Sequence, residues 1–139
     1  MNNTKKESIL VIEDNQLDML VVKVLLERHF NLYIVTNGED ALKAAKEFDF
    51  DIVLADINLG DQSMDGVKVM RQLRENEKTK DLKIFAVTAY ADNIKYYLDA
   101  GFDNVLTKPV IKEEIFEILY GPIDELNKME AVSLKKRSN

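Results

Sequence analysis

Short apolar runs alternate along the chain with segments whose apolar residues recur every three or four positions. The runs are continuous and rich in β-branched residues, which is typical of strands buried on both faces of a sheet; they cover 9–12, 32–35, 52–55, 82–87 and 105–106. A helical pattern follows each run. Asn15 is suited to begin the first helix as an N-cap, and Gly101 is suited to end the fourth.

Five strand–helix units in succession predict an α/β fold with a parallel sheet and helices on both faces. We expect the flavodoxin-like (βα)5 arrangement, a doubly wound five-stranded sheet in the order 2-1-3-4-5, with a Rossmann order as the alternative. We assign residues 1–7 to an N-terminal tail, 8–120 to a single domain, and 121–139 to a C-terminal helical extension or tail.

Composition narrows the function classes. The 139 residues are 46% hydrophobic, which is enough for one core, and the absence of cysteine excludes disulfides and thiolate metal sites. The net charge of −6 argues against non-specific nucleic-acid binding. No apolar run is long enough for a signal peptide or a membrane span. We therefore expect a cytoplasmic protein with neither a nucleic-acid nor a membrane partner.

Charged and hydroxyl side chains stand where four of the predicted strands end. Glu13 and Asp14 follow the first strand, Asp56 the third, Thr88 the fourth and Lys108 the fifth. In open α/β sheets, ligands bind outside the carboxyl ends of the strands. Each of these residues alone has an ordinary explanation, such as a helix N-terminal charge or a turn. Their combination predicts a site at one edge of the sheet.

Three carboxylates that meet at one edge repel one another and raise each other's pKa values unless a cation joins them. Mg²⁺ is the cation that suits such a site, because it prefers oxygen ligands and often shares a phosphate. A nearby lysine and threonine can bind phosphoryl oxygens, and an aspartate can act as a nucleophile that forms an aspartyl phosphate. The pattern therefore favours Mg²⁺-dependent phosphoryl transfer.

Several segments make the sequence resemble the receiver domain of response regulators, the phosphorylated proteins of two-component signal transduction. The resemblance covers about residues 8 to 120. Its motifs are LVIEDN (10–15), IVLADINL (52–59), MDG (64–66), VTAYA (87–91) and AGFDNVLTKP (100–109). It implies that Glu13 and Asp14 are the acidic pair of a Mg²⁺ site. Asp56 would be the phosphorylated residue and a further metal ligand, together with the backbone carbonyl of Asn58.

The resemblance also implies the rest of the machinery. Thr88 and Lys108 would bind the phosphoryl oxygens, and the Lys108-Pro109 bond is commonly cis in this family. The phosphoryl group would come from a histidine kinase or a histidine phosphotransfer protein, as in a phosphorelay. The chain would catalyse its own phosphorylation and dephosphorylation and have no independent metabolic substrate. A downstream protein of unknown identity would receive the signal.

Two positions depart from the family pattern, and a third is expected to modulate the chemistry of the site. Val105 replaces an aromatic residue, so output through an aromatic side chain is not expected. Gly60 stands where a proline is common, and we expect a more mobile loop there. Tyr90 lies two residues beyond Thr88, after the small Ala89. We expect its ring either to restrict the water that hydrolyses the acyl phosphate or to point into solvent and bind a partner.

Two other function classes share an acidic α/β edge. One is a Mg²⁺-dependent phosphohydrolase with an aspartyl-phosphate intermediate, although its usual DxD pattern and cap segment are missing. The other is a flavodoxin-like electron carrier, although Glu13 and Asp14 would repel its phosphate. For a receiver, output would pass through the fourth helix, fifth strand and fifth helix, a face that is also a candidate for homodimer formation. The sequence fits both a stand-alone regulator and a receiver from a hybrid kinase.

Overall fold

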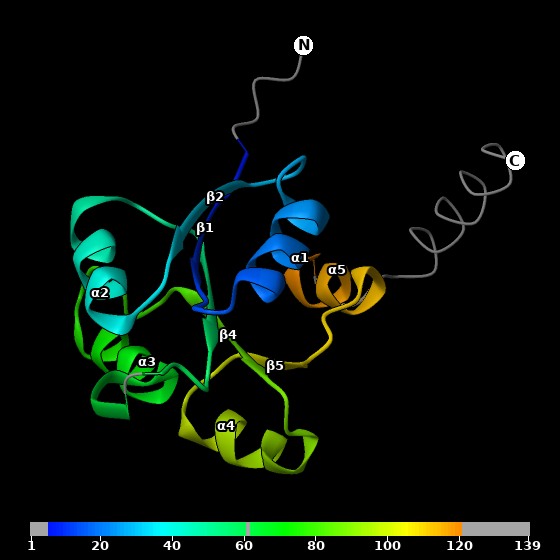
Figure 1. The fold of residues 1–139 in the computed structure, drawn as a ribbon. Helices are drawn as coiled ribbons and strands as arrows, with labels where there is room; N and C mark the ends of the chain where they lie inside the picture. Colours follow the sequence, from blue (N-terminus) through cyan, green and yellow to red (C-terminus); the bar gives the residue numbers. More distant parts are fainter. Residues whose placement is uncertain (1–5, 61, 121–139) are drawn as a thin grey trace, which may run out of the picture.

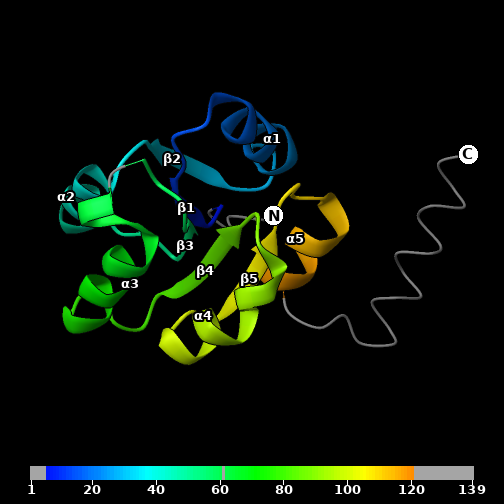
Figure 2. The same cartoon turned by 60° about the horizontal axis from the view of Figure 1, so that its bottom comes forward.

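The computed structural model of the protein describes residues 6–60 and 62–120. Five parallel strands form one sheet in the order β2-β1-β3-β4-β5, which confirms the predicted fold class and strand order (Figures 1 and 2). The strands are β1 (Ser8–Ile12), β2 (Asn31–Val35), β3 (Ile52–Asp56), β4 (Lys83–Thr88) and β5 (Asn104–Thr107). The α-helices are α1 (Gln16–Leu26), α2 (Gly38–Glu47), α3 (Gly66–Glu75), α4 (Ile94–Ala100) and α5 (Lys112–Tyr120).

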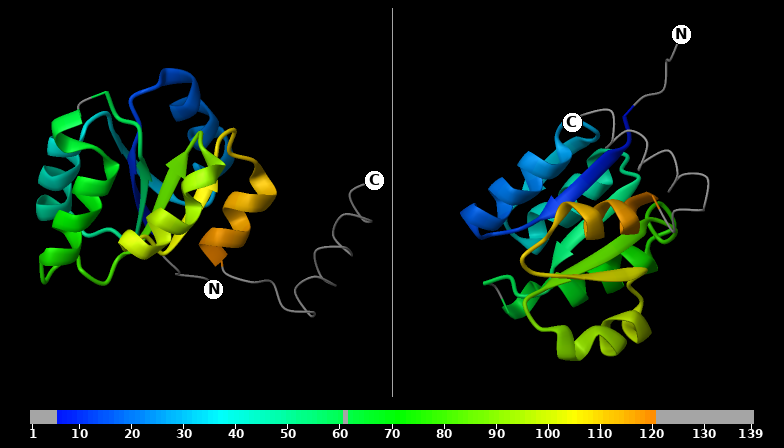
Figure 3. Two further views of the ribbon diagram at one scale, coloured as in Figure 1. Left: turned by 90° about the horizontal axis from the view of Figure 1, so that it is seen from below. Right: turned by 90° about the vertical axis from the view of Figure 1, so that its right-hand side faces the viewer.

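Helices cover both faces of the sheet and create two separate cores. Figure 3 shows α2 and α3 on one side of the sheet, and α1 and α5 on the other. One core joins α2, α3 and α4 to the sheet and includes Leu10 and Met70. The other joins α1 and α5 to the opposite face and includes Ile9 and Ile115. Neighbouring residues of β1 thus enter opposite cores, which explains why that strand is apolar throughout.

Polar side chains fix where the helices begin, and so fix the loops at the carboxyl edge of the sheet. The side chain of Asn15 accepts a hydrogen bond from the backbone N–H of Asp18, which confirms the N-cap predicted for α1. Asn37 caps α2 in the same way, and Asp65 caps α3. Gly101 ends α4 with a φ of 133°, a conformation that L side chains rarely adopt.

The structure adds two features to the predicted pattern. A short 3-10 helix, Gln62–Met64, lies within the loop that follows Asp56. The apolar spacing of α1 correctly indicates a helix, but much of that apolar surface faces solvent; the side chains concerned are Leu17, Leu20, Val21 and Val24.

Within residues 6–60 and 62–120, no helix is long and apolar enough to cross a membrane. The extension expected at 121–139 lies outside the described residues.

Candidate phosphoryl-transfer site

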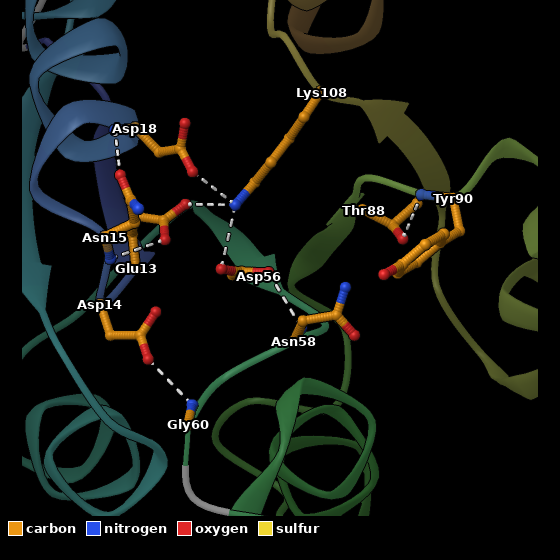
Figure 4. Close-up of polar contacts among 10 residues, drawn as sticks. All are labelled: Glu13, Asp14, Asn15, Asp18, Asp56, Asn58, Gly60, Thr88, Tyr90 and Lys108. Atoms are coloured by element: carbon orange, nitrogen blue, oxygen red, sulfur yellow. Dashed lines mark hydrogen bonds and ion pairs between the residues drawn. The ribbon is translucent and has the colours of Figure 1, made fainter.

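The five side chains predicted to form a site come from the carboxyl ends of four strands. Four of these side chains lie close together, namely Glu13, Asp14, Asp56 and Lys108. Glu13 and Asp14 directly follow β1, Asp56 ends β3, Thr88 ends β4, and Lys108 directly follows β5 (Figure 4). Backbone hydrogen bonds extend the sheet at these points. The N–H of Glu13 donates to the carbonyl of Val35, and the N–H of Lys108 donates to the carbonyl of Thr88. The sheet itself therefore fixes where these side chains start.

The ammonium group of Lys108 is the meeting point of three carboxylates. Its Nζ lies 2.8 Å from Asp18 Oδ2, 3.1 Å from Asp56 Oδ2 and 3.2 Å from Glu13 Oε1. Burial lowers the pKa of Lys108, but the hydrogen bond to Asp18, the charge of Asp56 and the remaining contacts outweigh it, so its pKa is raised overall. Lys108 is therefore positively charged at any physiological pH.

Glu13, Asp14 and Asp56 form a cluster that has the donor set for a hard metal ion. One carboxylate oxygen from each lies within 4.8 Å of the others, and Glu13 and Asp56 are buried. The pKa of Glu13 is raised to about 7, first because burial disfavours its charged form and also because it shares a hydrogen bond with Asp56, whose charge repels it. The backbone N–H of Asn15 and the charge of Lys108 oppose this rise. A divalent cation would relieve that crowding.

The loop after β3 is tied to the acidic cluster by backbone donors. The N–H of Asn58 donates to Asp56 Oδ1 at 2.9 Å, and the N–H of Gly60 donates to Asp14 Oδ2 at 2.8 Å. A Cβ atom at position 60 would lie only 3.3 Å from the same Asp14 oxygen, which favours glycine there. These two bonds orient Asp56 and Asp14 relative to one another. The metal-ligand role of the Asn58 carbonyl stays a prediction.

Thr88 lies beside the cluster and is fully buried. Its Oγ1 accepts a hydrogen bond from the backbone N–H of Tyr90 at 3.1 Å (Figure 4). Tyr90 is 61% exposed, and Ala89 is also exposed. Val105 is buried in the core between the sheet and α4. The Lys108-Pro109 bond is cis, as the family resemblance implies.

Asp18 is the site residue that sequence reasoning missed. It lies in the first turn of α1, and that turn stands at the carboxyl end of β1 because Glu13-Asp14-Asn15 is all that separates the two elements. An acidic residue at this place can reach the edge of the sheet. Its place four residues after Asp14 indicates that it lies near this edge, but only its contact with Lys108, 90 residues away, makes it part of the site.

Comparison with known proteins agrees with this geometry. A family model of the response regulator receiver domain matches residues 9–120, and the chain belongs to this family. The cell cycle response regulator CtrA of Brucella ovis is 34% identical over 109 residues, which are 77% of this chain and 46% of that protein. The cell cycle transcriptional regulator CtrA of Caulobacter vibrioides is 28% identical over 83% of this chain and 49% of its own length. The chain spans about half the length of these curated relatives.

Two solved receiver structures are similar at a comparable level. The receiver domain of the sensor histidine kinase PA1611 from Pseudomonas aeruginosa, with a magnesium ion coordinated in its active-site cleft, is 29% identical with a TM-score of 0.75; the match covers 83% of this chain and 95% of that one. A CheY-like receiver domain from Methylobacillus flagellatus is 31% identical with a TM-score of 0.74, and the match covers 84% and 98%.

The raised pKa of Glu13 makes the metal-free protein sensitive to pH. The folded protein holds a proton at Glu13 up to about pH 7, whereas the ordinary carboxyl value is 4.5, so this group's contribution to stability is lost as the pH rises through that window. We expect Glu13→Gln to reduce the loss of unfolding free energy between pH 5 and pH 8 by about 1–3 kcal/mol. Urea unfolding at each pH, in the presence of a metal chelator, measures this loss of unfolding free energy. Exposed Glu39→Gln is the control, and an equal pH dependence in wild type and Glu13→Gln would contradict the assignment.

Proposed function

We propose that this chain accepts a phosphoryl group on Asp56 from a phosphohistidine of a histidine kinase or a histidine phosphotransfer protein, and that the change regulates a partner protein. The observation that supports this most strongly is the setting of the Asp56 carboxylate. One of its oxygens is bound by the Asn58 N–H and the other by the Lys108 ammonium, at a buried point beside two further carboxylates.

The residues present fit a Mg²⁺ ion. Glu13, Asp14 and Asp56 would hold it with carboxylate oxygens, and Asn58 would hold it with its backbone carbonyl, with waters completing the shell. When bound, the ion supplies positive charge that offsets the negative charge of the phosphoryl oxygens. Its presence in the receiver of PA1611 supports the same assignment here.

The protein groups then act on the phosphoryl group by position and charge. A carboxylate oxygen of Asp56 attacks phosphorus; the new P–O bond forms while the P–N bond to the donor histidine breaks, and the leaving nitrogen keeps the electron pair and takes up a proton. Lys108, already hydrogen-bonded to Asp56, balances charge on one phosphoryl oxygen. The Thr88 hydroxyl donates to another.

The Thr88 hydroxyl also links the site to the segment that follows β4. Its Oγ1 accepts from the Tyr90 N–H, and Tyr90 immediately precedes the short 3-10 helix Ala91–Asn93 that leads into α4. Turning this hydroxyl toward a phosphoryl group would therefore alter the start of that 3-10 helix. Val105 is buried beneath α4 and offers no ring to move. We infer that output passes through the segment after β4 and the face made by α4, β5 and α5, which is also the candidate homodimer face.

The exposed apolar stripe of α1 provides the surface for the phosphodonor. Leu17, Leu20, Val21 and Val24 lie at helical spacing and are 38–74% exposed. The stripe starts next to Asp18, which contacts Lys108, so a partner bound along it would reach Asp56. An apolar helix of the donor suits this surface.

The expected absence of a nucleic-acid partner stays a prediction. The CtrA protein of Caulobacter vibrioides is a transcriptional regulator about twice as long as this chain, so the prediction concerns only the 139 residues of this chain.

Phosphorylation itself gives the most direct prediction. With Mg²⁺ and acetyl phosphate, the protein should gain one acid-labile phosphate, because the Asp56 carboxylate is held ready to attack phosphorus. Mass spectrometry of the intact protein measures the gain. Asp56→Asn should gain none, while Asp51→Asn, an exposed aspartate before the same strand, should behave as wild type. Equal labelling of Asp56→Asn would refute Asp56 as the acceptor.

The lifetime of the phosphorylated form tests the role of Tyr90. Tyr90 lies beside Thr88 at the open side of the site, and we infer that its exposed ring restricts water at phosphorus. Tyr90→Ala should then speed dephosphorylation about threefold or more, as expected for the loss of about 0.7 kcal/mol of barrier. Decay of labelled protein after donor removal measures the rate. Tyr96→Ala, a similarly exposed tyrosine on α4, is the control. A decay rate that does not change in Tyr90→Ala means that the ring serves another purpose.

Docking on α1 predicts a difference between donors. Leu20→Ala removes apolar contact area and should lower kcat/KM for transfer from a phosphorylated histidine phosphotransfer protein about tenfold, corresponding to roughly 1.4 kcal/mol. Transfer from acetyl phosphate, which needs no docking surface, should stay unchanged. Leu98→Ala, an exposed leucine on α4, is the matched control. A parallel loss with both donors would show damage to the site and contradict docking on α1.

A further inference from the structure

Asp18 is bound to Lys108 more closely than either of the other two carboxylates. The Asp18 contact is 2.8 Å, compared with 3.1 Å for Asp56 and 3.2 Å for Glu13. The Asp18 side chain is 37% exposed, whereas those of Glu13 and Asp56 are 5% and 3% exposed. Asp18 therefore holds the ammonium from the solvent side of the site, and it lies outside the carboxylate cluster proposed for Mg²⁺.

The helix does not need the Asp18 carboxylate for its N-terminal cap. α1 and α2 begin with the same pattern, Asn-x-x-Asp, and in both the asparagine side chain accepts from the backbone N–H of the aspartate. In α2 the Asp40 carboxylate turns back and accepts from Asn37 Nδ2 at 3.0 Å. In α1 the Asp18 carboxylate instead accepts from Lys108 Nζ. The same local motif is thus used differently where it borders the site.

The Asp18 contact bears on phosphorylation because a lysine ammonium has three N–H donors. Two of these donors form hydrogen bonds, to Asp18 and Asp56, and Glu13 lies 3.2 Å from the same nitrogen as an ion pair. A phosphoryl oxygen on Asp56 would therefore compete with Asp18 for the Lys108 ammonium, whose positive charge the carboxylates already balance. Asp18 Oδ2 and Asp56 Oδ2 lie within about 6 Å of one another since both contact the same nitrogen, so a phosphoryl dianion on Asp56 would also be repelled by Asp18.

We propose that Asp18 is a positioning residue that competes with the phosphoryl group for Lys108 and thereby lowers the stability of the phosphoryl group bound at Asp56. This rests on the proposed function of Asp56. Both residues of this ion pair line a cleft between α1 and the β5–α5 connection, together with Val21, Pro109 and Val110. Loss of the Asp18 charge would free Lys108 to turn fully toward Asp56.

The test compares two aspartates at the same helical position. Asp18→Asn and Asp40→Asn each remove one negative charge from the third residue of a helix capped by asparagine, but only Asp18 contacts Lys108. The affinity of each protein for beryllofluoride, an analogue of the phosphoryl group, is measured by calorimetry with saturating Mg²⁺. We expect Asp18→Asn to bind it about three- to tenfold more tightly than wild type, as one charge at this distance implies in a solvent-exposed setting. Asp40→Asn should stay within about twofold.

Salt separates a charge effect from a change of shape. Because the Debye length falls from about 10 Å at 0.1 M to about 3 Å at 1 M, the advantage of Asp18→Asn should shrink at high salt. Asp18→Ala, which also lacks the amide, should show the same direction. Unchanged or weaker binding by both Asp18 variants, or an equal gain in Asp40→Asn, overturns the role of Asp18 alone. No beryllofluoride binding by wild type overturns the proposed function and this inference together.

Discussion

The attraction of one ammonium group for several carboxylates holds the carboxyl edge of this sheet together. Lys108 reaches Glu13 after β1, Asp56 at the end of β3 and Asp18 on α1, so a single side chain joins α1 to the ends of two paired strands. Without it, Glu13 and Asp56 would be two buried acids with little to offset their charge. Even with it, the pKa of Glu13 is raised to about 7. The site has more negative charge than one lysine neutralises, which favours the binding of a divalent cation. The cation would in turn offset the charge of a phosphoryl group.

The rest of the fold serves to keep that concentration of charge in place. The central strands are buried on both faces, and their hydrogen-bonded register brings their carboxyl ends to a common edge. Gly66 begins α3 so close to the end of β3 that a side chain there would collide with the backbone of Asp56. Arg74, further along α3, donates to the carbonyls of Lys80, Leu82 and Gly101 and so ties the far end of the fold. Such a scaffold suits the proposed function, in which small changes at Thr88 and Lys108 would alter the surface.

Much of this could be predicted from the sequence because its signals are local. Continuous apolar runs identify buried parallel strands, strict alternation fixes the class of fold, and the strand order then brings Glu13, Asp56 and Lys108 to one edge. The contact of Asp18 with Lys108 could not be predicted, because it depends on the rotation of α1 about its axis. That same rotation decides that Leu17 and Leu20 face solvent, although their spacing is equally compatible with a buried face. Helical periodicity indicates that a helix forms, whereas only packing decides which of its apolar residues are covered.

A crystal structure of the protein with Mg²⁺ and beryllofluoride is the measurement that examines the site most directly. Beryllium should be bound to a carboxylate oxygen of Asp56, with the metal on Glu13, Asp14, Asp56 and the carbonyl of Asn58. Lys108 Nζ and Thr88 Oγ1 should each contact a fluorine atom. Beryllofluoride bound elsewhere, or bound to Asp56 with Lys108 directed away from it, would contradict the assignment of this site to phosphoryl transfer.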